Sequence, residues 1–163
     1  MRLAKLYQQT WPDQRLDVDV VATVSWAGAN SFFADNSAGH LLISPESAGH
    51  EALETVFHEA SHGFMLRPAP LQDALTRAAE RLGVRVPDGL WHVVLFYTTG
   101  ETIRMVVEAA GEPGYEPMIY EIFGRSSWGD YREAMDATWP SYMDGRKSAF
   151  EAAMEITRQI HRQ

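Results

Sequence analysis

Two histidines and a glutamate within five residues could form a metal site that activates water. Residues 58–62 read His-Glu-Ala-Ser-His, inside a longer run of sequence that favours a helix. Residues four positions apart lie on one face of a helix, roughly 6 Å apart along the axis. His58 and His62 could therefore each give one ring nitrogen to the same ion, and zinc accepts such nitrogens at about 2.0–2.1 Å. Glu59 is turned away from this pair but could hydrogen-bond a water on the ion, as a general base does.

The residues around this motif are uncharged, which indicates a buried setting rather than a solvated helix face. Thr55–Phe57 precede the motif, Gly63–Met65 follow it, and the small residues Ala60 and Ser61 separate the two histidines. The alternative interpretation is a partly buried helix whose two histidines hydrogen-bond to the backbone and bind no metal.

In this motif the chain resembles the zincin superfamily of zinc metallopeptidases. The resemblance is sharp over residues 55–64 and weaker over the flanking hundred residues. It implies a bound Zn²⁺, a peptide-hydrolase site, a peptide or protein as substrate, and a metal-binding helix packed under a small sheet.

A catalytic zinc site generally takes three protein ligands, and the motif supplies only two of them. In the metzincin class the third is a His ten residues after the first, where this chain has Pro68. The metal-dependent deformylases take a Cys, and this sequence contains none. The resemblance therefore points to the gluzincins, whose third ligand is a Glu on a later helix.

Glu101 is the expected third ligand, because it lies in the most apolar predicted helix of the chain. Its neighbour Gly100 costs about 1 kcal/mol of helix propensity, which suggests close packing against another element. Glu101 could instead belong to a solvated stripe with Tyr97 and Arg104. The rival ligand is His92, about 13 Å away along the same helix, and a straight helix allows only one of the two.

The remaining sequence predicts one α+β, zincin-like domain over residues 1–163. A small N-terminal β-meander leads into the metal helix, and a mainly helical half follows. The expected strands are 16–24, 31–34 and 40–44, and the expected later helices are 71–82, 89–110, 130–138 and 148–161. The strand His40–Ser44 could be an edge strand that pairs with an extended substrate, or an ordinary edge strand.

Composition excludes several classes of function. Hydrophobic residues make up 45% of the chain and charged residues 22%, which is ordinary for a globular domain. No apolar run reaches the length of a membrane span, and no signal-peptide pattern is visible, so we expect no membrane partner and, by default, a cytoplasmic location. The net charge of −8 argues against a nucleic-acid partner. The oligomeric state stays open.

The sequence thus predicts a gluzincin-like zinc metallopeptidase, with Zn²⁺ bound by His58, His62 and Glu101. As the resemblance implies, Glu59 would take a proton from the attacking water and pass it to the leaving amine. Tyr97 or another aromatic hydroxyl could stabilise the oxyanion. The alternative is a catalytically silent zinc-binding protein of the same fold. A diiron site is set aside, because it needs a second Glu-x-x-His and the sequence has none.

Overall fold

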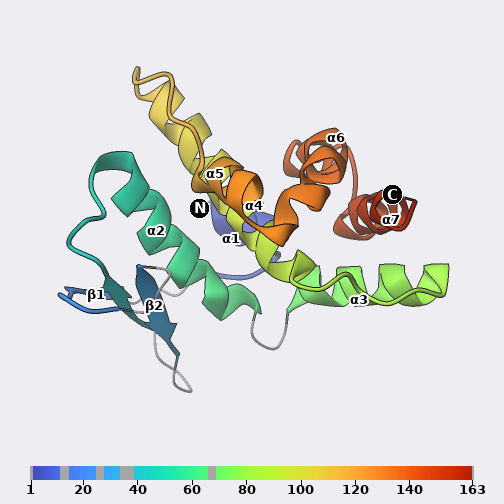
Figure 1. The fold of residues 1–163 in the computed structure, drawn as a ribbon, viewed down its shortest axis with the longest axis horizontal. Coiled ribbons are helices and arrows are strands. Elements are labelled where there is room, and N and C mark those ends of the chain that lie inside the picture. The colour runs from blue at the N-terminus through green and yellow to red at the C-terminus, as the bar shows by residue number, and fades with distance from the viewer. Residues whose placement is uncertain (1, 12–14, 25–27, 34–38, 66–68, 163) are drawn as a thin grey trace.

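The computed structural model describes residues 2–11, 15–24, 28–33, 39–65 and 69–162 of the chain. Residue 34, the end of the second predicted strand, and Pro68 lie outside this part. The elements follow in the order α1 (Arg2–Leu6), β1 (Asp17–Val20), β2 (Ala29–Phe32), β3 (His40–Ile43), α2 (Gly49–His62), η1 (Gly63–Met65), α3 (Pro70–Leu82), α4 (Leu90–Ala109), α5 (Met118–Arg125), η2 (Ser127–Tyr131), α6 (Arg132–Met143) and α7 (Ala149–Ile160) (Figure 1). The described chain is therefore α+β and mainly helical, with one small sheet.

The sheet has the strand order β1-β3-β2, which is not the order of a meander. β1 runs parallel to β3, with Asp17 opposite His40, and β2 runs antiparallel to β3. The predicted meander is wrong, because β3 lies between β1 and β2 in the sheet. Among the described strands β3 is central, so it is not the edge strand that could pair with an extended substrate.

β1 also differs from its prediction as a mostly buried strand. All four of its residues are exposed, and Val20 keeps 62% of its surface accessible. The reason is the position of α2, which packs on β2 and β3 and leaves the β1 edge largely uncovered. The β-branched residues of β1 therefore predict its extended conformation correctly but not its burial.

The helix α4 lies at the centre of the core. It is in contact with α2, α5 and α6 (Figure 1). The near-continuous apolar sequence of this helix predicts such burial. Two predicted helix ends are confirmed. Gly83 ends α3 in a left-handed conformation with φ 69°, and Ser148 begins α7 with a capping box to Glu151. Residues 118–125, which fall between two of the predicted helices, form α5, and this helix buries Ile119 and Phe123.

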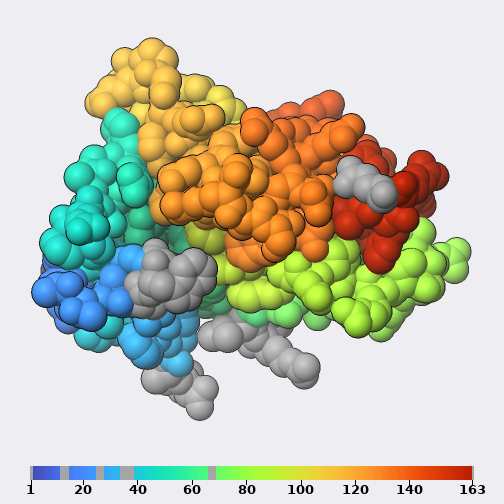
Figure 2. All heavy atoms as spheres, in the orientation of Figure 1, coloured from blue at the N-terminus to red at the C-terminus, as the bar shows by residue number. Residues whose placement is uncertain are grey.

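None of the helices in the described ranges combines the length and the apolar character needed to cross a membrane. Figure 2 shows the residues that follow α4, in yellow and orange, on the face of the molecule beside α2, in teal. This segment and α2 are joined by hydrogen bonds from Tyr115 and Met118 to the carboxylate of Glu54.

At Gly100, α4 packs closely against its neighbours. A Cβ atom at this position would lie 2.7 Å from Cβ of Pro117 and 2.9 Å from Oε1 of Glu54. The close packing that the sequence predicts at Gly100 is therefore confirmed, and the neighbours are α2 and the residue before α5.

Gly100→Ala is expected to lower the thermal stability of the protein. Overpacking a tight contact costs roughly 1–3 kcal/mol, which offsets or exceeds the gain of about 1 kcal/mol that alanine brings to a helix. Thermal unfolding followed by circular dichroism measures the difference. Gly124→Ala in α5 is the matched control, because a Cβ there meets nothing within 4 Å. Equal or higher stability of Gly100→Ala would show that Pro117 and Glu54 move aside at little cost.

Candidate metal centre

Three histidines from two packed helices meet at one point of the structure. His58 and His62 lie in the last two turns of α2, and His92 lies in the first turn of α4. One ring nitrogen from each can be chosen so that all three lie within 4.8 Å of one another. The Nε2 atoms of His58 and His92 are 3.2 Å apart. Ligand nitrogens of a tetrahedral zinc ion with bonds of 2.0–2.1 Å lie about 3.3–3.4 Å apart, so the His58–His92 pair has nearly this separation.

The two histidines of α2 come together as their spacing predicts. Their ring centroids are 4.9 Å apart, with the planes nearly perpendicular at 87°. His92 is brought to them by the packing of α2 against α4, since its ring lies 5.2 Å from His58 and 5.0 Å from His62. The helix supplies one part of the site locally, and the tertiary fold supplies the other.

Burial keeps all three imidazoles neutral at neutral pH. The pKa of His58 is held well below its usual range, mainly by burial and to a smaller extent by the neighbouring His62 and His92. Burial also lowers the pKa of His62, and burial followed by the charge of His62 lowers the pKa of His92 to about 4. Neutral imidazole is the form that binds metal, so the cluster is ready to accept an ion without losing protons first.

The two ring nitrogens of His58 differ in their partners, since Nε2 lies within hydrogen-bond distance of Nε2 of His92. Within the described part of the chain, Nδ1 of His58 is buried and has no hydrogen-bond partner. Buried polar atoms of proteins are nearly always paired. The interpretation in which both histidines of α2 are satisfied by backbone groups is therefore not supported at His58.

Glu59, the residue after His58, is buried, with 7% of its surface exposed. Burial raises the pKa of its carboxyl group, and a hydrogen bond with Ser31 of β2 lowers it in part. A carboxylate with a pKa shifted toward neutrality is a stronger base than an ordinary surface glutamate. Glu59 thus follows His58 directly in the sequence, and its carboxyl group is hydrogen-bonded to Ser31 of β2.

Glu101, the expected third ligand, is engaged elsewhere. Its Oε1 accepts a hydrogen bond of 3.1 Å from the Tyr120 hydroxyl, and its Oε2 accepts bonds from Nε and Nη2 of Arg104. The structure groups His92, not Glu101, with His58 and His62. The reason is that the N-terminal end of α4 packs against His58 and His62. His92 lies in the first turn of α4, whereas Glu101 lies about 13 Å farther along the helix axis.

Tyr97, considered as an oxyanion stabiliser, also has another partner. Its hydroxyl donates a hydrogen bond of 3.0 Å to Oδ1 of Asp136 in α6. The Tyr120 hydroxyl oxygen lies 3.2 Å from the same Asp136 oxygen and shares its one proton between Asp136 and Glu101. The Tyr97 hydroxyl therefore takes part in a polar network between α4, α5 and α6.

Glu54 is a buried acid that the sequence reasoning missed. It is fully buried in α2 and accepts hydrogen bonds from the Tyr115 hydroxyl at 2.7 Å and from the Met118 backbone N–H at 3.2 Å. Burial is the main cause that raises its pKa to about 7. The available signal was its spacing, since Glu54 precedes His58 by four residues and His62 by eight, on the same helix face.

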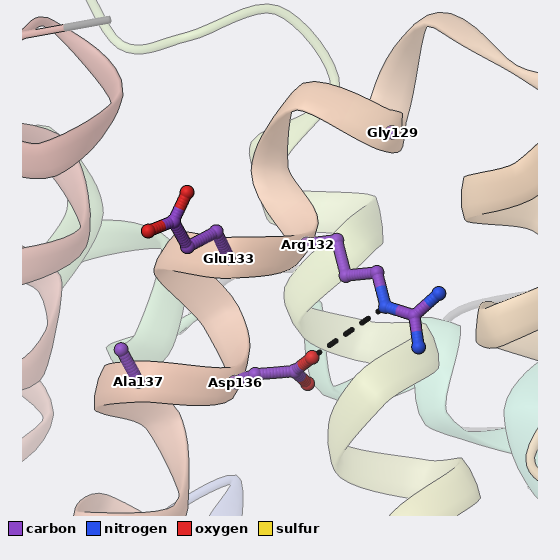
Figure 3. A pocket seen from close by; sticks show the side chains of 5 residues that line it. All are labelled: Gly129, Arg132, Glu133, Asp136 and Ala137. Atoms are coloured by element: carbon purple, nitrogen blue, oxygen red, sulfur yellow. Dashed lines mark ion pairs between the residues drawn. The ribbon is translucent and has the colours of Figure 1, made fainter.

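A surface hollow of about 660 Å³ lies away from the histidines, over the start of α6 (Figure 3). It is lined by Gly129, Arg132, Glu133, Asp136 and Ala137. Arg132 and Asp136 pair with each other at 3.6 Å across it. None of the three histidines borders this hollow, so it is not part of the metal centre.

Comparison with protein-family models, with curated proteins and with solved structures gave no match to this chain. The chemistry of the centre is therefore interpreted from the residues that form it.

Proposed function

We propose that the protein is a zincin-like, zinc-dependent hydrolase in which His58, His62 and His92 hold the ion. The observation that carries the proposal is the meeting of three imidazoles whose nitrogen atoms lie within 4.8 Å of one another, and the residue after His58 in the sequence is the buried Glu59. His92 replaces Glu101 as the third ligand in this proposal.

A bound zinc ion would supply a Lewis acid and lower the pKa of a water molecule. Glu59 would accept the proton of that water at its carboxylate and give it to the nitrogen of the leaving amine. The raised pKa of Glu59 suits both transfers, because it brings the group closer to neutral pH. Three neutral imidazoles would leave the double positive charge of the ion uncompensated, whereas a glutamate ligand would offset part of it.

The proposed substrate is a peptide or protein, as the His-Glu-x-x-His motif suggests. The second candidate is a zinc-binding protein without turnover. One observation favours it: the hollow over α6 is not lined by the three histidines, so this hollow does not serve as a substrate cleft at the centre. Glu59 favours the first candidate, because a structural zinc site has no need of a buried acid beside its ligands.

Metal removal tests the proposal directly. The purified protein is expected to carry about one zinc ion per chain, and a chelator should lower its melting temperature because zinc binds the folded state. A mixture of unstructured peptides, analysed by mass spectrometry, should show cleavage that stops with the chelator and returns with added zinc. Zinc binding without cleavage would favour the silent zinc-binding protein, and a metal-free protein with no thermal shift on adding zinc would reject both candidates.

Zinc binding is expected to resist acid more than the ordinary pKa of histidine suggests. Protons compete with the ion for imidazole nitrogen, and the lowered pKa values of the three histidines weaken that competition. Affinity should therefore stay nearly constant from pH 7.5 down past about 6.5, the usual pKa of histidine. It should fall steeply only toward the pKa of about 4 of His92. Competition with a chelator of known pH dependence measures this profile, and a steep loss already between pH 7 and 6 would contradict it.

A further inference from the structure

Aromatic side chains surround the histidine cluster. The Phe96 ring stacks on His58 with centroids 3.6 Å apart, and the Trp128 ring meets His92 edge-on at 5.3 Å. Trp91 lies next to His62, with ring centroids 6.0 Å apart. All three aromatic residues are half-buried, so each leaves part of its surface accessible.

Trp128 differs from the other two because it comes from a separate segment, η2, and is held there by specific contacts. Its backbone N–H donates to the Ser126 hydroxyl at 3.2 Å, and the nearby Tyr131 hydroxyl donates to the carbonyl of Asp88 at 3.0 Å. The indole fills the space next to Gly89, where a Cβ atom would lie 2.7 Å from its Nε1. Gly89 has φ 73°, so a side chain there is disfavoured both by the backbone and by the indole.

The three aromatic residues Phe96, Trp91 and Trp128 form an apolar wall beside the cluster, although the chain as a whole is strongly acidic. Phe96, Trp91 and Trp128 carry no charge, while the net charge of the chain is −8. A ligand group that lay against these rings would gain from aromatic stacking and from burying apolar surface. A carboxylate in the same place would lose hydration without finding a partner among these rings.

We propose that Trp128 is a specificity-determining residue of the metal centre. Its indole forms a wall that favours ligands with an aromatic or large aliphatic group next to their metal-binding atoms. This inference rests on the proposed function, since it requires an ion at His58, His62 and His92. Trp128 is not a ligand or a base; it selects the group that the ligand carries.

Binding of two hydroxamates to the cobalt-loaded protein tests the inference without any need for turnover. Acetohydroxamate presents a methyl group beside its metal-binding atoms, and phenylacetohydroxamate presents a benzyl group. The visible absorption of Co²⁺ reports the binding of each. Phenylacetohydroxamate is expected to bind the parent protein about tenfold more tightly, which is the range that one aromatic contact supplies.

Trp128→Ala should reduce this advantage to about threefold or less when both hydroxamates are measured on protein saturated with Co²⁺. Trp128→Phe keeps an aromatic face and should keep most of the advantage, which separates loss of the wall from loss of folding. Phe150→Ala is the control, because Phe150 is a half-buried aromatic residue of α7, where it lies under Arg77.

The possible failures are distinct. A protein that takes up no Co²⁺ refutes the proposed function itself. Co²⁺ uptake with equal affinity for the two hydroxamates, or with an advantage that survives Trp128→Ala, refutes the role of Trp128 alone. A loss of Co²⁺ affinity in both Trp128 variants, with no change in the ratio of the two hydroxamates, would show that the indole only shields the imidazoles from water.

Discussion

His92→Ala is expected to lower the zinc affinity of the protein by roughly 100-fold or more, since losing even an outer partner of a ligand costs about 10–100-fold. Glu101→Gln is expected to leave the affinity nearly unchanged. The structure gives the reason for both expected results. The Nε2 atoms of His92 and His58 are 3.2 Å apart, whereas the Glu101 carboxylate is hydrogen-bonded to Arg104 and Tyr120. Competition with a chromophoric chelator measures both affinities.

The control for general effects of losing a histidine is His40→Ala. His40 is exposed on β3 and pairs with Asp19 at 2.9 Å, so it should have no influence on zinc. The opposite pattern, with zinc kept in His92→Ala and lost in Glu101→Gln, would restore the gluzincin-type ligand set. If both variants keep their zinc, the third ligand is neither His92 nor Glu101.

The third ligand shows where inference from sequence reaches its limit. The relation of His58, Glu59 and His62 follows from helix geometry over five residues, and no distant part of the chain can change it. His92 and Glu101 stand on one predicted helix, and both are chemically able to bind zinc. Choosing between them requires knowing which end of α4 meets the end of α2, and this is a property of packing between distant segments.

The sheet shows the same limit. Its three short strands could be located from β-branched runs and turn residues, and all three are present. The order of the strands in the sheet could not be predicted. The alternation of apolar residues and the β-propensity describe each strand alone and do not say which strands pair. Burial of β1 was also predicted from its valines, and it fails because α2 covers only β2 and β3.

Glu54 and Gly100 are a case in which more could have been inferred. Gly100 in an apolar helix predicted a close contact, and the structure supplies its partner as Oε1 of Glu54. Glu54 itself was visible in the sequence, one turn before His58 on the face that carries both histidines. A glutamate on a buried helix face needs partners, and here the segment after α4 provides them through Tyr115 and Met118.

Glu59→Gln is the change with the largest expected effect on catalysis. Turnover of any peptide that the parent protein cleaves should fall by about 100-fold or more, because the amide cannot accept the proton of the attacking water. Zinc content and melting temperature should stay close to those of the parent, since glutamine keeps the size of the side chain and an oxygen that can accept the hydrogen bond of Ser31. Glu51→Gln is the matched control, on an exposed position in the first turn of the same helix.

Ser31 gives an independent way to identify Glu59 as the base. The acid limb of the pH–rate profile reports the pKa of a base that must be deprotonated to act. Burial raises the pKa of Glu59, and the hydrogen bond with Ser31 opposes this rise. Ser31→Ala removes the opposing contact, so the pKa should rise further and the acid limb should move to higher pH, with turnover at alkaline pH little changed. An unmoved limb, or full turnover in Glu59→Gln, would mean that another group activates the water and that Glu59 serves only the packing of α2 against β2.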